Sequence, residues 1–143
     1  MIISVHYDEK FNLLLLRHGG TFVGDEGQLA LVDFVREHKQ VPACFILDTR
    51  EVKSSDLKGT DRANLAHTDR QLMQANPSEL YTMKLIGITP PDPEHPMNQR
   101  FQRMLSNANA TLKRNDTNQA AIVHTWEDAL VEAGLPRTLK QPY

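Results

Sequence analysis

The spacing of apolar residues changes repeatedly along this chain of 143 residues, and this constrains its fold more than any other feature. Residues 1–7 alternate apolar and polar side chains, as a strand with one wet face does. From Asp25 the apolar positions instead recur every three or four residues, at Leu29, Val32 and Val35, which is the spacing of an amphipathic helix. The chain is therefore predicted to combine strands with helices.

Two strands are expected to open the chain as an antiparallel hairpin. Residues 1–7 and 11–17 carry the strand pattern, and the polar residues 8–10 between them are expected to form the turn. Gly19 and Gly20 are expected to end the second strand.

A continuous apolar run lies further along the chain, at residues 43–47, and ends at Asp48. A short run of this kind is typical of a strand that is buried on both faces. We therefore expect a parallel strand in the centre of a sheet. Residues 49–60 are polar and are expected to form a long exposed loop.

Helices and strands alternate through the rest of the chain. The pattern predicts a helix from about residue 61, a strand at 80–89, a helix with apolar residues between 97 and 112, a strand at 120–124 and a final helix. Thr125, with Asp128 three residues later, is a capping arrangement for the final helix, and Gly134 marks its end.

This order of elements predicts an α/β fold. We expect a mixed, mostly parallel sheet of about five strands, with an N-terminal antiparallel hairpin and about four helices that lie mostly on one face. A chain of this length suits one hydrophobic core. The prediction is a single domain over residues 1–135, followed by a C-terminal tail at residues 136–143.

Charge and hydropathy exclude several classes of protein. Sixteen Lys and Arg against eighteen Asp and Glu give a net charge of -2, so no nucleic acid partner is expected. The longest apolar run, residues 13–16, is far shorter than the roughly twenty residues of a membrane helix. The start of the chain lacks the pattern of a signal peptide, so a cytoplasmic location is expected.

Cysteine and histidine give no evidence for a metal or a cofactor. The single cysteine, Cys44, lies within the apolar residues 41–47 and is expected to be a core residue. The six histidines show neither His-x-x-x-His spacing nor a partner pair of cysteines. No metal site and no cofactor are predicted, and no catalytic motif is complete.

Three segments are similar to pieces of bacterial SpoIIAA-like proteins. They are the hairpin ending in Gly19 and Gly20, the segment FILDTREV at residues 45–52 and the segment IVHTWEDAL at residues 122–130. With the order of elements, they make residues 1–135 resemble the STAS domains of anti-sigma-factor antagonists. The resemblance implies a noncatalytic regulatory or protein-interaction module that binds a protein partner.

In that family a strand ends in Asp, and the loop that follows presents a phosphorylatable serine. The matching residues 48–61 read DTREVKSSDLKGTD, so the resemblance makes Ser54 and Ser55 candidate phosphorylation sites. This chain departs from the family pattern because the acidic residue, Asp56, follows the serines and Gly59 comes late. The candidate loop for a partner or ligand contains Asp48, Thr49, Arg50, Lys53, Asp56 and Lys58.

Two other functions stay open. Sheets of α/β proteins bind ligands at the carboxyl ends of their strands, where His124 and Thr125 are candidates to line a crevice with residues 48–50. An enzyme would place its active site there. The apolar stripe that starts at Met97 would instead suit a carrier of a small apolar or anionic ligand. The N-terminal edge strand makes a homodimer plausible.

Overall fold

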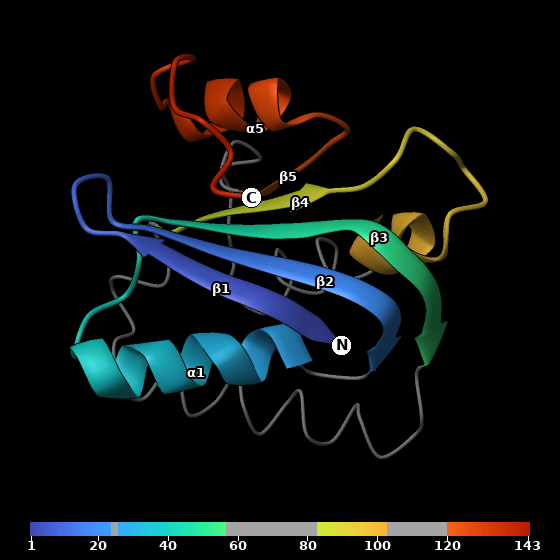
Figure 1. Ribbon diagram of the computed structural model, residues 1–143, viewed down its shortest axis with the longest axis horizontal. Coiled ribbons are helices and arrows are strands. Elements are labelled where there is room, and N and C mark those ends of the chain that lie inside the picture. Colours follow the sequence, from blue (N-terminus) through green and yellow to red (C-terminus); the bar gives the residue numbers. More distant parts are fainter. Residues whose placement is uncertain (24–25, 57–82, 103–119) are drawn as a thin grey trace.

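The computed structural model describes residues 1–23, 26–56, 83–102 and 120–143. Within these ranges, five strands form one mixed sheet against which helices pack (Figure 1). The strands are β1 (Ile2–Asp8), β2 (Leu13–Val23), β3 (Cys44–Asp56), β4 (Lys84–Ile88) and β5 (Ala120–Val123). The described helices are α1 (Glu26–His38), α5 (Trp126–Ala133) and a third at residues 96–102. The helix expected from about residue 61 lies outside the described residues.

The strands follow the sheet in their order along the chain, β1-β2-β3-β4-β5. β1 pairs with β2 in antiparallel fashion, and the three other neighbouring pairs are parallel. These pairings confirm the N-terminal hairpin and the mostly parallel sheet. They also confirm the predicted central strand. β3 contains most of the apolar run at residues 43–47, and it is the middle one of the five strands.

Two apolar layers cover the sheet on opposite faces. Alternate residues of β2 divide between them: Leu14 and Leu16 face α1 and residues 96–102, whereas Leu13 and Leu15 face α5. Figure 1 shows α1 and α5 on opposite sides of the sheet. Among the described helices, α1 and the helix at residues 96–102 share one face, which agrees with the expectation that the helices lie mostly on one face, while α5 covers the other.

β2 and β3 continue well beyond the ends predicted for them. β2 passes through Gly19 and Gly20, and β3 passes through residues 49–56, which were expected to form a loop. The pairing register shifts on both sides of this glycine pair, and Gly20 has a φ of 60° that a glycine tolerates without strain. The bulges interrupt the two-residue alternation, which explains why the strand pattern in the sequence ends there although the strand continues.

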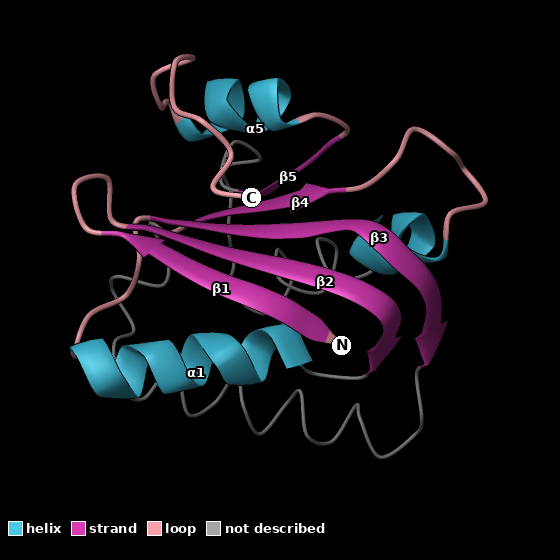
Figure 2. Cartoon of the chain, in the orientation of Figure 1, coloured by secondary structure: helices cyan, strands magenta, loops and turns pink. Residues whose placement is uncertain are grey.

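We call the extended pair, residues 19–23 and 51–56, the ribbon. In it Thr21 pairs with Ser54, and Phe22 pairs with Ser55. β4 ends at Ile88, opposite Asp48, so among the described strands only β2 pairs with β3 beyond this point. Figure 2 shows the ribbon bending away from the rest of the sheet.

The C-terminal part of the chain lies on the α5 face of the sheet. Thr125 caps α5 by accepting a hydrogen bond from the backbone N–H of Asp128, at 3.1 Å, as predicted. Gly134 ends the helix in the left-handed conformation, with a φ of 69°. Residues 136–143, expected as a tail, pack here: Leu139 contacts the core, and its carbonyl accepts a hydrogen bond from the Trp126 indole.

Gly87 should be sensitive to substitution because it lets β4 approach the third helix. A methyl group at this position would lie 2.9 Å from two atoms of the Phe101 ring. We expect Gly87→Ala to lower the free energy of unfolding by about 1–3 kcal/mol through overpacking. Urea denaturation measures this loss.

The second substitution Phe101→Leu provides the control, because it removes the ring that the methyl group meets. It should cost less in the Gly87→Ala background than in the wild type. Equal costs in the two backgrounds would show that the close packing of Gly87 on Phe101 is unimportant for stability.

Candidate functional site

The two candidate phosphorylation residues lie in the ribbon, on neighbouring positions of β3. Ser54 is exposed, and its hydroxyl is 2.9 Å from the hydroxyl of Thr21 on the paired strand. Ser55 is half-buried, and its hydroxyl accepts a hydrogen bond of 2.7 Å from the Arg100 guanidinium. The two serines therefore have different surroundings, although they are adjacent in sequence.

Arg100 is a functional candidate that the sequence did not identify. Its side chain comes from the third helix and is only 5% exposed, which is unusual for an arginine. The guanidinium carbon lies 4.5 Å from the centre of the Phe22 ring, so a cation–π contact fixes it beside Ser55. Arg100 is off the apolar stripe of its helix, and it is buried against Phe22 and Ser55 of the ribbon.

His18 lies in the same layer and is completely buried. Its ring contacts the Phe22 ring, with 4.6 Å between centroids. Neither ring nitrogen has a hydrogen-bond partner among the described residues, although Nδ1 is 3.7 Å from a carboxylate oxygen of Glu26. Burial lowers the pKa of His18 to about 4, and the positive charges of the N-terminal ammonium and of Arg100 add to this effect. His18 is therefore neutral at neutral pH.

Asp48 and Arg50 form a second polar group, on the α5 face. Two guanidinium nitrogens of Arg50 donate to the two Asp48 carboxylate oxygens, at 2.9 and 2.7 Å. The Tyr143 hydroxyl also donates to Asp48, and Arg50 donates to Gln141 at 2.9 Å. Burial alone would raise the pKa of Asp48, but these hydrogen bonds outweigh it and keep the pKa below its usual value.

Tyr143 connects this group to the N-terminal hairpin. The Arg17 guanidinium lies 4.4 Å from the centre of the Tyr143 ring, and Arg17 also forms an ion pair with Glu51. Burial raises the pKa of Tyr143, and its hydrogen bond to Asp48 raises it further. Asp48 and Arg50 are thus occupied by partners from their own chain. The sequence did not indicate these contacts, since 95 residues separate Asp48 from Tyr143.

The remaining strand-end candidates belong to a different group. Thr49 is buried, and its hydroxyl donates to the Ile88 carbonyl at 2.9 Å. His124 is exposed, and its Nδ1 donates to the Thr89 carbonyl at 2.8 Å. Thr125 serves as the cap of α5.

The crevice predicted from residues 48–50, His124 and Thr125 stays a prediction. Asp48 and Arg50 interact with the C-terminal residues, whereas His124 interacts with the end of β4. Of the candidate loop, Lys53 is exposed and Asp56 is half-buried at the end of β3. Lys58 lies outside the described residues.

Cys44 is a core residue, as expected. It is 4% exposed, and burial raises the pKa of its thiol to about 12. A thiol with so high a pKa is almost entirely protonated at neutral pH and is a poor nucleophile.

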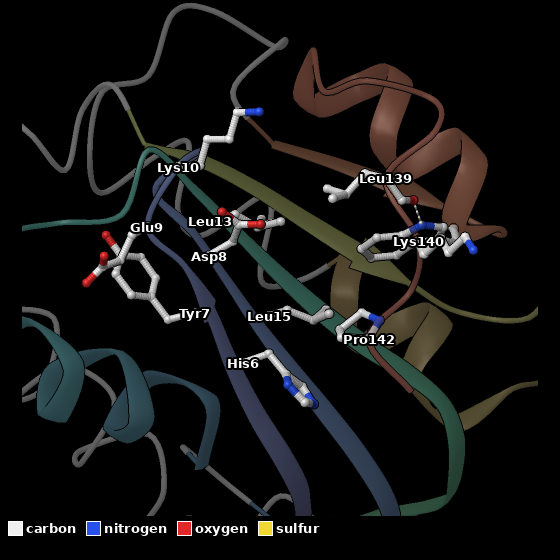
Figure 3. A pocket seen from close by; sticks show the side chains of 11 residues that line it. His6, Tyr7, Asp8, Glu9, Lys10, Leu13, Leu15, Leu139, Lys140 and Pro142 are labelled. Atoms are coloured by element: carbon white, nitrogen blue, oxygen red, sulfur yellow. Dashed lines mark hydrogen bonds between the residues drawn. The ribbon is translucent and has the colours of Figure 1, made fainter.

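A groove lies between the N-terminal hairpin and the C-terminal residues, with a volume of about 670 Å³ (Figure 3). Its apolar lining comes from Leu13, Leu15, Trp126, Leu139 and Pro142. Its polar and charged lining comes from His6, Tyr7, Asp8, Glu9, Lys10 and Lys140. The volume is within the usual range for small-molecule sites. This groove is on the α5 face and differs from the position expected beside the third helix.

Comparisons with models of known families, with curated proteins and with solved structures found no match to this chain. Across the described ranges, no cluster of three His, Cys, Asp or Glu residues is arranged to hold a metal ion. The helices of those ranges include none with the length and apolar character needed to cross a membrane.

Burial of His18 should make the protein sensitive to acid. The pKa is about 4 in the folded chain and about 6.5 in the unfolded chain, so only the unfolded chain binds this proton between the two values. The free energy of unfolding should therefore be unaffected by His18 above pH 6.5 and fall as the pH drops toward 4. The full loss is about 3 kcal/mol.

His18→Phe should remove this contribution, because the aromatic ring is kept and the titrating group is lost. Urea denaturation of both proteins between pH 4 and pH 7.5 measures it. The wild type should lose more stability than the variant as the pH falls through this window. Parallel curves for the two proteins would contradict the assignment of His18 as a buried neutral histidine.

Proposed function

We propose that this protein is a noncatalytic regulatory module of the cytoplasm, which presents the ribbon to a protein partner and is switched by serine phosphorylation. The observation that carries the proposal is the ribbon itself. It holds the exposed side chains of Lys53 and Ser54 on a paired, extended backbone. Paired strands keep such side chains in fixed positions, and preorganisation of this kind favours binding.

The resemblance of the sequence to anti-sigma-factor antagonists also supports this proposal. It predicts a phosphorylatable serine in the segment that follows Asp48. Both candidate serines follow Asp48, but they lie within β3 and not in a loop. A phosphoryl group would add nearly two negative charges to this surface at neutral pH. A charge change of this size is enough to alter the binding of a partner that contacts the ribbon.

An enzyme site at the strand ends has less support. Asp48 and Arg50 are engaged with Gln141 and Tyr143, so a substrate would have to displace contacts within the chain. The regulatory module is therefore the preferred function. The homodimer through the edge strand β1, which exposes Ile3 and Val5, stays a prediction.

The ribbon can be tested by measuring partner capture from the native host. We expect the variant Lys53→Ala/Ser54→Ala to lose most of a partner that the wild type retains, because both exposed side chains are removed. Quantitative mass spectrometry of the captured proteins measures the change. Arg137→Ala, an exposed cation beyond α5, is the matched control and should capture the partner like the wild type.

Two results would contradict the interaction proposal. One is capture of the same proteins, in the same amounts, by the ribbon variant and the wild type. The other is equal loss of binding in the Arg137→Ala control, because this would show a general defect of the variants and not a role of the ribbon.

The groove supports a second function, a carrier for a small ligand with an apolar body and an anionic group. Its apolar lining would contact the body, and Lys10 and Lys140 would attract the negative charge. The sequence predicts such a carrier with its pocket beside the third helix, whereas the site proposed here is the groove on the α5 face.

Dodecanoate is a suitable probe for this second function. Isothermal titration should detect its binding to the wild type, and Lys10→Glu/Lys140→Glu should weaken binding about tenfold, because two attractive charges become repulsive. Lys53→Glu, in the ribbon, is the control and should bind like the wild type. Equal affinity in all three proteins would exclude the groove as the site.

A further inference from the structure

We propose that Ser55 is the phosphoryl acceptor of this protein and that Arg100 binds the phosphoryl group once it is attached. This inference rests on the proposed function, because it specifies which serine acts as the switch and what reads it. It also gives a role to Arg100, which is buried and is not one of the exposed residues proposed to contact the partner.

The geometry distinguishes the two serines. The Ser55 hydroxyl already accepts a hydrogen bond of 2.7 Å from Nη1 of Arg100, so a phosphoryl group on this oxygen would be next to the guanidinium. The hydroxyl of Ser54 has the neutral Thr21 hydroxyl as its neighbour, at 2.9 Å. In the described part of the structure, the contact of the Ser55 hydroxyl is with a cation and that of the Ser54 hydroxyl is with a neutral group, so a phosphoryl group on Ser55 would lie directly beside a cation.

Arg100 is held ready for this contact before any phosphoryl group is present. The Phe22 ring, itself fully buried, supports the guanidinium at 4.5 Å. A guanidinium can donate two parallel hydrogen bonds to phosphate oxygens, and such charge-assisted pairs are roughly twice as strong as neutral hydrogen bonds. Because the side chain is only 5% exposed, solvent screens the pair weakly.

Ser55 is half-buried, so part of its surface remains open to a modifying enzyme. A protein kinase would supply the group from a nucleoside triphosphate. The bond from Ser55 Oγ to the γ-phosphorus forms as the bond to the bridging β,γ-oxygen breaks. The nucleoside diphosphate leaves with that electron pair, and the serine proton passes to a base of the kinase.

The pair would tie two elements together, since Ser55 is at the end of β3 and Arg100 belongs to the third helix. Figure 1 shows residues 96–102 beside the bend of β3, in agreement with the hydrogen bond between them. Phosphorylation would then strengthen the attachment of the ribbon to the body of the protein while it changes the charge of the ribbon. A partner that contacts the ribbon would sense both effects.

The test installs phosphoserine during synthesis at position 55 of the full chain, and in a second protein at position 54. Phosphorus-31 NMR then measures the second pKa of each phosphate, which is about 6 in the absence of a charged neighbour. We expect the phosphate at position 55 to titrate at least one unit below the phosphate at position 54, because a nearby cation favours the dianion.

Substitutions of Arg100 identify the cation. Arg100→Gln in the phosphoserine-55 protein should return the phosphate pKa to the value measured at position 54, and Arg100→Lys should keep part of the shift. If Arg100→Gln fails to fold, the comparison of positions 55 and 54 and the Arg100→Lys protein still decide the result. Phosphates that titrate alike at both positions would overturn the inference.

The same inference would be overturned if protein from the native host carried phosphate on Ser54 alone. The proposed function would survive that result, because the switch would still be in the ribbon. If instead no partner depends on the ribbon, the proposed function fails, whereas NMR on the purified protein still shows whether Arg100 binds the phosphoryl group.

Discussion

Pairing of β3 with β2 on one side and β4 on the other organises this protein. The first half of β3 is buried on both faces, with Phe45 and Leu47 in one apolar layer and Cys44 and Ile46 in the other. Both layers depend on the same strand, so the helices on the two faces are positioned relative to each other through it. The polar residues that follow the apolar run therefore lie at and beyond the end of β4.

The second half of β3 separates from this arrangement and pairs only with β2 among the described strands. The bulges beside Gly19 and Gly20 make this possible, because they let β2 bend and continue in parallel with β3. The resulting ribbon places Ser54 in solvent and Ser55 against Arg100. A backbone feature of β2 thus determines the chemistry that is available to two serines of β3.

Charged groups in the described structure are divided by the sheet. Arg100 and the neutral His18 lie on one face, around Phe22, while Asp48 and Arg50 lie on the other and contact Tyr143.

The sequence by itself determined the α/β class, the N-terminal hairpin, the central strand and the cap of α5 at Thr125. These features follow from the spacing of apolar residues and from local capping chemistry, which act over a few neighbouring residues. Only the tertiary structure decided that α5 covers the second face, that β2 and β3 continue as the ribbon, and that Arg100 and Tyr143 reach their partners. Contacts of this kind join residues 45 and 95 positions apart, and their formation depends on the completed sheet rather than on any local pattern.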